Sequence, residues 1–167
     1  MRTSCMVLLM TMMGGSFATP AALANDAHHA AAVVQDIDPA AQEAVAVVEA
    51  FSAAIKGVRI DEASALLDPT VLVLESGGSE RNRDQYLAEH AQADAQYMKD
   101  ARQALRYQQA RVLGDIAWVG SESIISHNKD GELSSSLSTE TMVLKKTAQG
   151  WKIVHIHWSS RPAPGSS

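Results

Sequence analysis

The sequence predicts an α+β domain in which N-terminal helices pack on a strongly curved antiparallel sheet. Three segments in the first half of the chain repeat apolar residues at helical spacing. From about residue 102 onward, the chain instead consists of four strand-like runs separated by turn sequences. Helices that precede a block of strands, rather than alternating with them, are typical of the α+β class.

The N-terminal segment 1–24 has the pattern of a secretory signal peptide. Arg2 precedes an apolar run over residues 6–13, and the small-residue triplet Ala22-Leu23-Ala24 supplies a cleavage site. This run falls far short of the roughly 20 residues needed to span a bilayer. We therefore expect cleavage after Ala24 and a periplasmic or secreted protein with no membrane association after cleavage.

The chain after the predicted cleavage site, 25–167, is long enough for one domain with its own core. We expect a flexible lead over 25–38, a single domain over 39–161 and a short tail over 162–167. The only cysteine, Cys5, lies within the predicted signal, so no disulfide is expected. His28 and His29 stand in the lead, where two imidazoles alone would make a weak metal site.

The charge balance excludes one class of partner. The chain has 19 acidic residues against 14 basic ones, and its Lys and Arg residues form no cluster. Such a surface repels a phosphate backbone. We expect no nucleic-acid partner.

A first helix is predicted over residues 39–56. Asp38 supplies an N-cap, Pro39 occupies the first helical position, and Gly57 ends the run. Apolar residues recur at helical spacing within it at Val45, Val48, Phe51 and Ile55.

Two further helices and one strand complete the first half. A short helix is predicted over 62–67, and the apolar run 71–75 is a strand closed by Gly77-Gly78. Asn82 with Gln85 three residues later forms a capping-box pattern, which opens a third helix over 83–98.

The second half predicts an antiparallel meander. Its strand-like runs are 103–114, 116–127, 133–146 and 151–160. The turn sequences between them are Gly114-Asp115, 128–131 and 148–150. Because the runs follow each other through short turns, each is expected to pair with the next.

Two segments carry a resemblance to a known family. The capped helix "NRDQYLAEH" (82–90) after a Gly-rich hairpin and the closing "STETMVLKKTAQGWKIVHIHWSS" (138–160) resemble the nuclear transport factor 2-like superfamily, which includes SnoaL-like polyketide cyclases and ketosteroid isomerases. Within it, the C-terminal strands most resemble the calcium/calmodulin-dependent protein kinase II association domain. The resemblance spans roughly residues 40–161.

The resemblance implies a cone-shaped, cystatin-like α+β fold with a pocket between the helices and the concave face of the sheet. It also implies a homodimer formed through the sheet. The superfamily includes isomerases, cyclases and dehydratases, but also members that only bind or assemble, so the fold does not decide the activity. No residue-by-residue match exists for the isomerases' acidic base and tyrosine donor, and Met142 stands where related association domains carry an arginine.

The last strand carries two histidines. His155 and His157 are two positions apart, so a regular strand places them on one face with Trp151 and Ile153. Because both faces of this strand are apolar, we expect the imidazoles to be buried and hydrogen-bonded to neighbouring strands. The expected partners are Glu122, Glu140 and Ser138.

Two other roles stay open for these histidines. One of them could act as a general acid/base, because imidazole titrates near working pH. A metal site would need a third ligand such as His90 or Glu140. Of the three interpretations, we favour the hydrogen-bonded network without metal or cofactor.

The third helix offers a second polar group. Tyr86, His90 and Asp94 recur at every fourth position, which places them along one face, toward either the cavity or the helix edge. Trp118 is either core or a pocket wall. The candidate pocket residues are therefore Tyr86, His90, Trp118, Glu122, Glu140, His155 and His157.

Two functions from different classes follow. The first is a periplasmic, non-catalytic module that binds a small molecule or assembles, with a homodimer through the sheet. The alternative is an isomerase, cyclase or dehydratase in which a pocket histidine moves a proton. The sequence favours the first because it shows no acid-plus-donor pair.

Overall fold

The computed structural model describes residues 32–129 and 131–164. The predicted signal peptide and the pair His28 and His29 lie outside the described residues. Within them, no helix combines the length and the apolarity needed to cross a membrane.

The first helical segment begins where the sequence predicts. The 3-10 turn Pro39–Ala41 leads into α1 (Gln42–Lys56). The Asp38 carboxylate accepts a hydrogen bond from the backbone N–H of Ala40 at 2.9 Å, which satisfies one of the free donors at this end. Helix α2 (Ile60–Leu66) follows after a short turn.

The predicted third helix is two helices. Helix α3 (Arg83–Glu89) and helix α4 (Ala91–Lys99) meet at His90, whose φ of −117° departs from helical values. The predicted cap is present, because Asn82 accepts a hydrogen bond from the backbone N–H of Gln85 at 2.8 Å. The break at His90 changes the direction of the chain between Tyr86 and Asp94.

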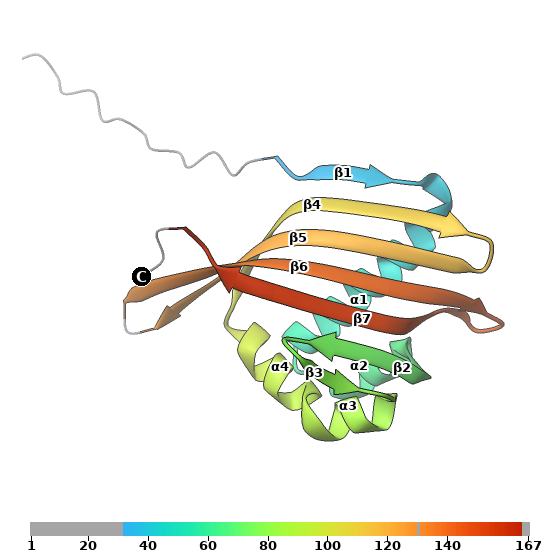
Figure 1. Cartoon of the computed structure of the whole chain (residues 1–167), viewed down its shortest axis with the longest axis horizontal. Helices are drawn as coiled ribbons and strands as arrows, with labels where there is room; N and C mark the ends of the chain where they lie inside the picture. The colour runs from blue at the N-terminus through green and yellow to red at the C-terminus, as the bar shows by residue number, and fades with distance from the viewer. Residues whose placement is uncertain (1–31, 130, 165–167) are drawn as a thin grey trace, which may run out of the picture. The chain divides into compact units, whose positions relative to one another are not determined.

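In the described part of the chain, seven strands form one mixed sheet in the order β1-β4-β5-β6-β7-β2-β3. Their bounds are β1 Val34–Ile37, β2 Leu67–Glu75, β3 Gly78–Glu80, β4 Arg102–Leu113, β5 Ile116–Lys129, β6 Glu132–Thr147 and β7 Gly150–Pro162. The four long strands form the predicted meander and lie side by side in Figure 1.

Two parallel pairings depart from the predicted antiparallel sheet. Strand β2 pairs with β7, and β1 pairs with β4, both in parallel. Strand β1 lies within the segment for which the sequence predicts a flexible lead, so the last residues of that lead are paired. Both pairings join segments far apart in the sequence, and local patterns therefore do not reveal them.

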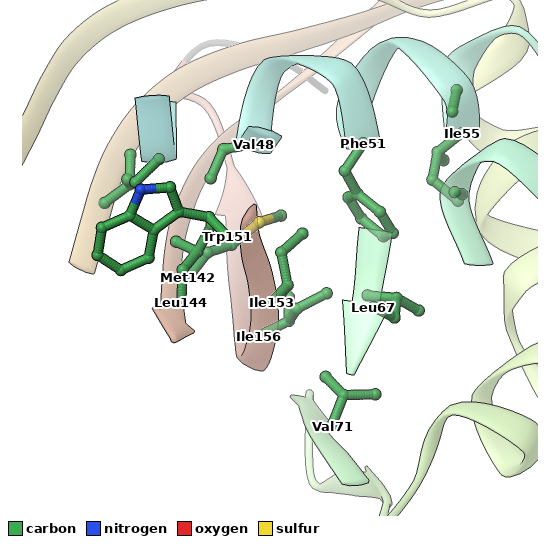
Figure 2. Close-up of a cluster of buried hydrophobic side chains, with 14 of the residues drawn as sticks. Val48, Phe51, Ile55, Leu67, Val71, Met142, Leu144, Trp151, Ile153 and Ile156 are labelled. Carbon is green, nitrogen blue, oxygen red and sulfur yellow. The ribbon is translucent and has the colours of Figure 1, made fainter. Parts of the chain in front are cut away.

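The core lies between α1 and one face of the sheet. Figure 2 shows Val48, Phe51 and Ile55 directed from α1 toward the side chains of Ile153 and Ile156 on β7. Burying an apolar side chain of this size contributes roughly 1.5–3 kcal/mol to folding. Helix α1 also contacts α2 and α4, so the apolar contacts fix the position of α4 beside the sheet.

Candidate functional site

A cavity of about 350 Å³ lies between the helices and the inner face of the sheet. Its helical wall consists of Phe51, Ser52 and Ile55 from α1 and of Asp94, Tyr97 and Met98 from α4. Its strand wall carries two acidic residues, Glu75 and Glu140, together with Trp158 and a group of serines. The size is within the range of small-molecule sites.

Trp158 anchors the strand wall. Its ring Nε1–H donates a hydrogen bond to Oε2 of Glu140 at 2.8 Å. The indole stacks against Phe51 with ring centroids 6.5 Å apart, and it meets Tyr86 at 6.3 Å in a tilted arrangement. Contacts with two aromatic rings and a hydrogen bond therefore hold one orientation of the indole and, through it, the Glu140 carboxyl.

The environment of Glu140 favours the neutral form of its carboxyl group. Burial raises its pKa above the ordinary value, and the hydrogen bond from Trp158 opposes that shift only in part. Its second oxygen, Oε1, has no hydrogen-bond partner among the described residues. When protonated, Glu140 can therefore donate a hydrogen bond to a bound molecule; when ionised, it can only accept one.

Asp94 is paired with Tyr86. The phenol O–H of Tyr86, a fully buried residue, donates to Oδ2 of Asp94 at 2.9 Å. Burial raises the pKa of Asp94, while the bond from Tyr86 and the charge of His90 lower it. Burial and the adjacent Asp94 also raise the pKa of Tyr86, so the phenol stays protonated and acts as a donor.

Glu75 is the third carboxyl group of the lining. It ends β2 opposite Trp158 on β7 and is exposed. Partial burial and then the charge of Asp94 raise its pKa. Three carboxyl groups with raised pKa values thus share one cavity, a concentration that is common at functional sites.

Serine hydroxyls form the polar end of the cavity. Gln103 donates to Oγ of Ser123 at 3.3 Å, so part of this wall is held by the neighbouring strand. The serines of the lining are Ser52, Ser121, Ser123, Ser138, Ser159 and Ser160. Each hydroxyl can donate or accept a hydrogen bond.

The structure does not bring His155 and His157 to this cavity. Leu144 pairs with Ile153 but Val143 pairs with His155, so Val154 is an extra residue and β7 carries a β-bulge. An extra residue moves every later side chain to the opposite face.

The prediction that the histidines share the face of Trp151 and Ile153 is therefore wrong. Ile156 and Trp158 take the inner face, and the histidines point to the outer one. His157 is exposed. His155 is half-buried, and its Nδ1 lies 2.9 Å from the carbonyl oxygen of Leu72.

His90 lies outside the cavity lining. It forms an ion pair with Glu80, whose side chain is buried at 5% exposure. Glu80, Glu89 and His90 each place one ligand atom within 4.8 Å of the others, so this group has the donor set for a metal ion. The metal set considered from the sequence does not form, because His155 and His157 face away from Glu140.

Trp118 and Glu122 also face outward. Trp118 alternates with the buried Ala117 and Val119, and it is half-buried. Glu122 is exposed and lines a second hollow of about 510 Å³ with Arg106 and Arg161. Of the candidate pocket residues, only Glu140 lines the cavity between the helices and the sheet. Tyr86 lies behind that lining, where it contacts the lining residues Asp94 and Trp158.

Glu75, Asp94 and Tyr97 are lining residues that the candidate set omits. The spacing of Tyr86 and Asp94 does signal that they are near each other, and their hydrogen bond forms across the break between α3 and α4. Glu75 carries no such signal. It reaches the cavity because β2 pairs with β7, a contact between segments far apart in the sequence.

Comparisons with known proteins agree on the fold. The profile of the SnoaL-like domain family matches residues 44–164. No curated protein matches the chain. Among solved structures, a presumed ketosteroid isomerase from Shewanella frigidimarina is 33% identical with a TM-score of 0.68, over 74% of this chain and 99% of that one.

Two association-domain structures are more distant. One from Xanthomonas campestris, described as a presumed calcium/calmodulin-dependent protein kinase II association domain, is 20% identical with a TM-score of 0.61, over 81% of this chain and 95% of that one. The association domain of the C. elegans kinase is 19% identical with a TM-score of 0.60, over 71% and 93%. The helices on a curved, open sheet and the matched profile confirm the predicted superfamily, and this chain belongs to the SnoaL-like domain family.

Proposed function

We propose that this protein is exported and binds a small, partly apolar molecule in the cavity between α1, α4 and the sheet. The observation that carries the proposal is the Glu140 carboxyl, held by Trp158 with one oxygen free toward a cavity of about 350 Å³. Apolar walls with a few fixed polar groups are typical of ligand sites. Export rests on the signal pattern over residues 1–24.

A cavity-filling variant tests the binding. Ser52 lines the cavity from α1, whereas its neighbour Ala53 is exposed. We expect Ser52→Phe to abolish thermal stabilisation by compounds that stabilise the wild type, and Ala53→Phe to leave it intact. The readouts are a thermal-shift panel and native mass spectrometry. Compounds that bind Ser52→Phe as tightly as the wild type would refute a site in this cavity.

A second candidate, an acid/base enzyme, is favoured by the pair of Tyr86 and Asp94. Asp94 has one oxygen on the Tyr86 hydroxyl and a second with no partner among the described residues. It could take a proton adjacent to a carbonyl while protonated Glu140 donates to the carbonyl oxygen. The 33% identical relative is a presumed ketosteroid isomerase, which supports this class.

In this second candidate the acid/base groups are carboxyls rather than a histidine, since no described lining residue is a histidine. The test is NMR-detected deuterium exchange next to the carbonyl of a ketone panel. Catalysed exchange that Asp94→Asn abolishes would establish the enzyme. Binding without exchange would leave the binding module as the function.

Assembly is the third part of the proposal. We propose a homodimer through the outer face of the sheet, where Trp118, Val143, His155 and Leu72 form one row across β5, β6, β7 and β2. Leu72 is 37% exposed and Trp118 is half-buried. The likeness to association domains, whose name implies assembly, supports this part.

A further inference from the structure

The charge of the cavity lining is one-sided. Glu75, Asp94 and Glu140 line it, and no described lining residue is Lys, Arg or His. Lys56 of α1 is not a lining residue, and its Nζ is held by the carbonyl oxygen of Ala101 at 2.9 Å. The protein thus supplies acidic groups to this space and no positive partner from the lining itself.

The groups behind the lining do not reverse this sign. Around Asp94 stand Tyr86, Glu80 and His90, and His90 is committed to its ion pair with the buried Glu80. Glu75 faces the same Asp94, Glu80 and His90. His127 is not a lining residue, and its ring packs on Tyr97 of the lining with ring centroids 4.4 Å apart.

Glu140 has Trp158 as its only described partner. An anion entering the cavity would therefore meet carboxyl groups with nothing to balance them. An entering cation would meet up to three of them, and its positive charge would lower their raised pKa values and favour their ionised forms.

Aromatic rings complete a cation site. Phe51, Tyr97 and Trp158 line the same space as the three carboxyl groups. A cation within about 6 Å of a ring centroid is attracted to the ring face, most strongly for Trp. Trp158 is fixed by its bond to Glu140, so ring and carboxyl are presented together.

We propose that the ligand of this cavity is an organic cation, a protonated amine on an apolar body, held by Glu140 and Asp94 with the body against Trp158 and Phe51. This inference rests on the proposed binding function and names its ligand class. A neutral ligand would make only the apolar contacts. A carboxylate ligand would make the same contacts but would be repelled by the carboxyl groups of the cavity. The order of affinity is therefore amine, then alcohol, then acid.

Three probes with the same phenyl group test this order: 2-phenylethylamine, 2-phenylethanol and phenylacetate. We expect calorimetry at pH 7.5 to give the amine an affinity roughly tenfold above that of the alcohol, the scale of one cation–π contact with a charge-assisted hydrogen bond. Phenylacetate should bind most weakly. In Glu140→Gln and in Asp94→Asn the advantage of the amine over the alcohol should shrink.

The control is Glu49→Gln, the same chemical change at an exposed residue of α1. It should keep the full preference for the amine. The cation inference is overturned if the alcohol or the acid binds as tightly as the amine or more tightly. It is also overturned if the preference for the amine survives in both cavity variants. Either result leaves the proposed binding function standing. The cation inference is overturned as well if none of the three probes binds while the compound panel yields a neutral ligand. Failure of the panel and the probes together defeats both proposals.

Discussion

One residue, Trp158, connects the polar and the apolar parts of the cavity. It donates to Glu140 and packs against Phe51 and Tyr86, so one side chain sets the position of a buried acid and of two rings. Burial raises the pKa of Glu140 above that of a glutamate on the surface. Its raised pKa has a consequence for stability that does not depend on any ligand.

Glu140→Gln should change the pH dependence of folding. Because the pKa of Glu140 is raised in the folded state, the native protein holds this proton more tightly than the unfolded chain. Its contribution to stability is present below the unfolded pKa and is lost as pH rises through the folded one, at about 1.4 kcal/mol for each unit of difference. Relative to the wild type, the variant should therefore gain stability from pH 4.5 to pH 8.

Urea denaturation across that pH range measures the effect. Glu49→Gln, at an exposed site, should follow the wild-type profile throughout. A constant difference between Glu140→Gln and the wild type would mean that the folded and unfolded chains hold this proton equally tightly, which contradicts a raised pKa of Glu140 in the folded protein.

The two histidines of β7 should behave differently from each other. His157 is exposed, so His157→Ala should change the free energy of unfolding by less than about 0.5 kcal/mol. His155→Ala removes the contact between Nδ1 and the Leu72 carbonyl oxygen, which should cost about 0.5–1.5 kcal/mol. Chemical denaturation at pH 7.5 separates the two. A loss in His157→Ala as large as about 2 kcal/mol, the scale of a buried group left unpaired, would place that side chain inside a buried network.

At the scale of elements, one inserted residue decides which side chains face the cavity. The bulge at Val154 lets β7 present Trp151 and Ile153 and then Ile156 and Trp158 on the inner face. Without it, strict alternation would turn the second pair outward. The break at His90 likewise determines how Tyr86 of α3 and Asp94 of α4 meet.

Deletion of Val154 should therefore disrupt the core. The shortened strand can keep Trp151 and Ile153 inside only by exposing Ile156 and Trp158, or the reverse. We expect a loss of at least about 3 kcal/mol, comparable to removing a large core side chain. Val154→Ala, which keeps the chain length, should cost less than about 1.5 kcal/mol because Val154 is only half-buried. Equal unfolding midpoints for the deletion and the substitution would contradict the role of the bulge.

Much of the element order could be predicted, because caps, turns and periodicity are local signals. Asp38, Asn82 and the turns between the long strands all lie where the pattern places them. The bulge at Val154 has no such signal, since a β-branched residue there fits a regular strand equally well. Strand alternation therefore predicts Glu140 as a pocket residue correctly, whereas it places His155 and His157 on the wrong face.

For the molecule as a whole, the resemblance predicted the superfamily correctly and the site only in part. The fold follows from elements that many sequences share, while Glu75 and Asp94 enter the cavity through the pairing of β2 with β7 and the break at His90. The two faces of the sheet then divide the proposed roles. The inner face forms the cavity, and the outer face presents the row that contains Trp118 and Val143.

A charge on the outer face should separate the proposed dimer. We expect sedimentation of residues 25–167 at tens of micromolar to report a dimer, since ordinary specific interfaces have affinities of ~µM or better. Trp118→Glu should shift it to a monomer, because an unpaired carboxylate in an interface is costly. Leu113→Glu, at a residue that is 70% exposed at the end of β4, should remain dimeric. A wild-type monomer would rule out assembly through this face.

The crystal structure of the protein with the tightest-binding compound of the panel would locate the ligand site directly. We expect the compound in the cavity between α1, α4 and the sheet, with its apolar body on Trp158 and its polar group within hydrogen-bond distance of Glu140. A compound bound instead in the hollow of Arg106 and Arg161, or on the outer face of the sheet, with this cavity empty, would contradict it.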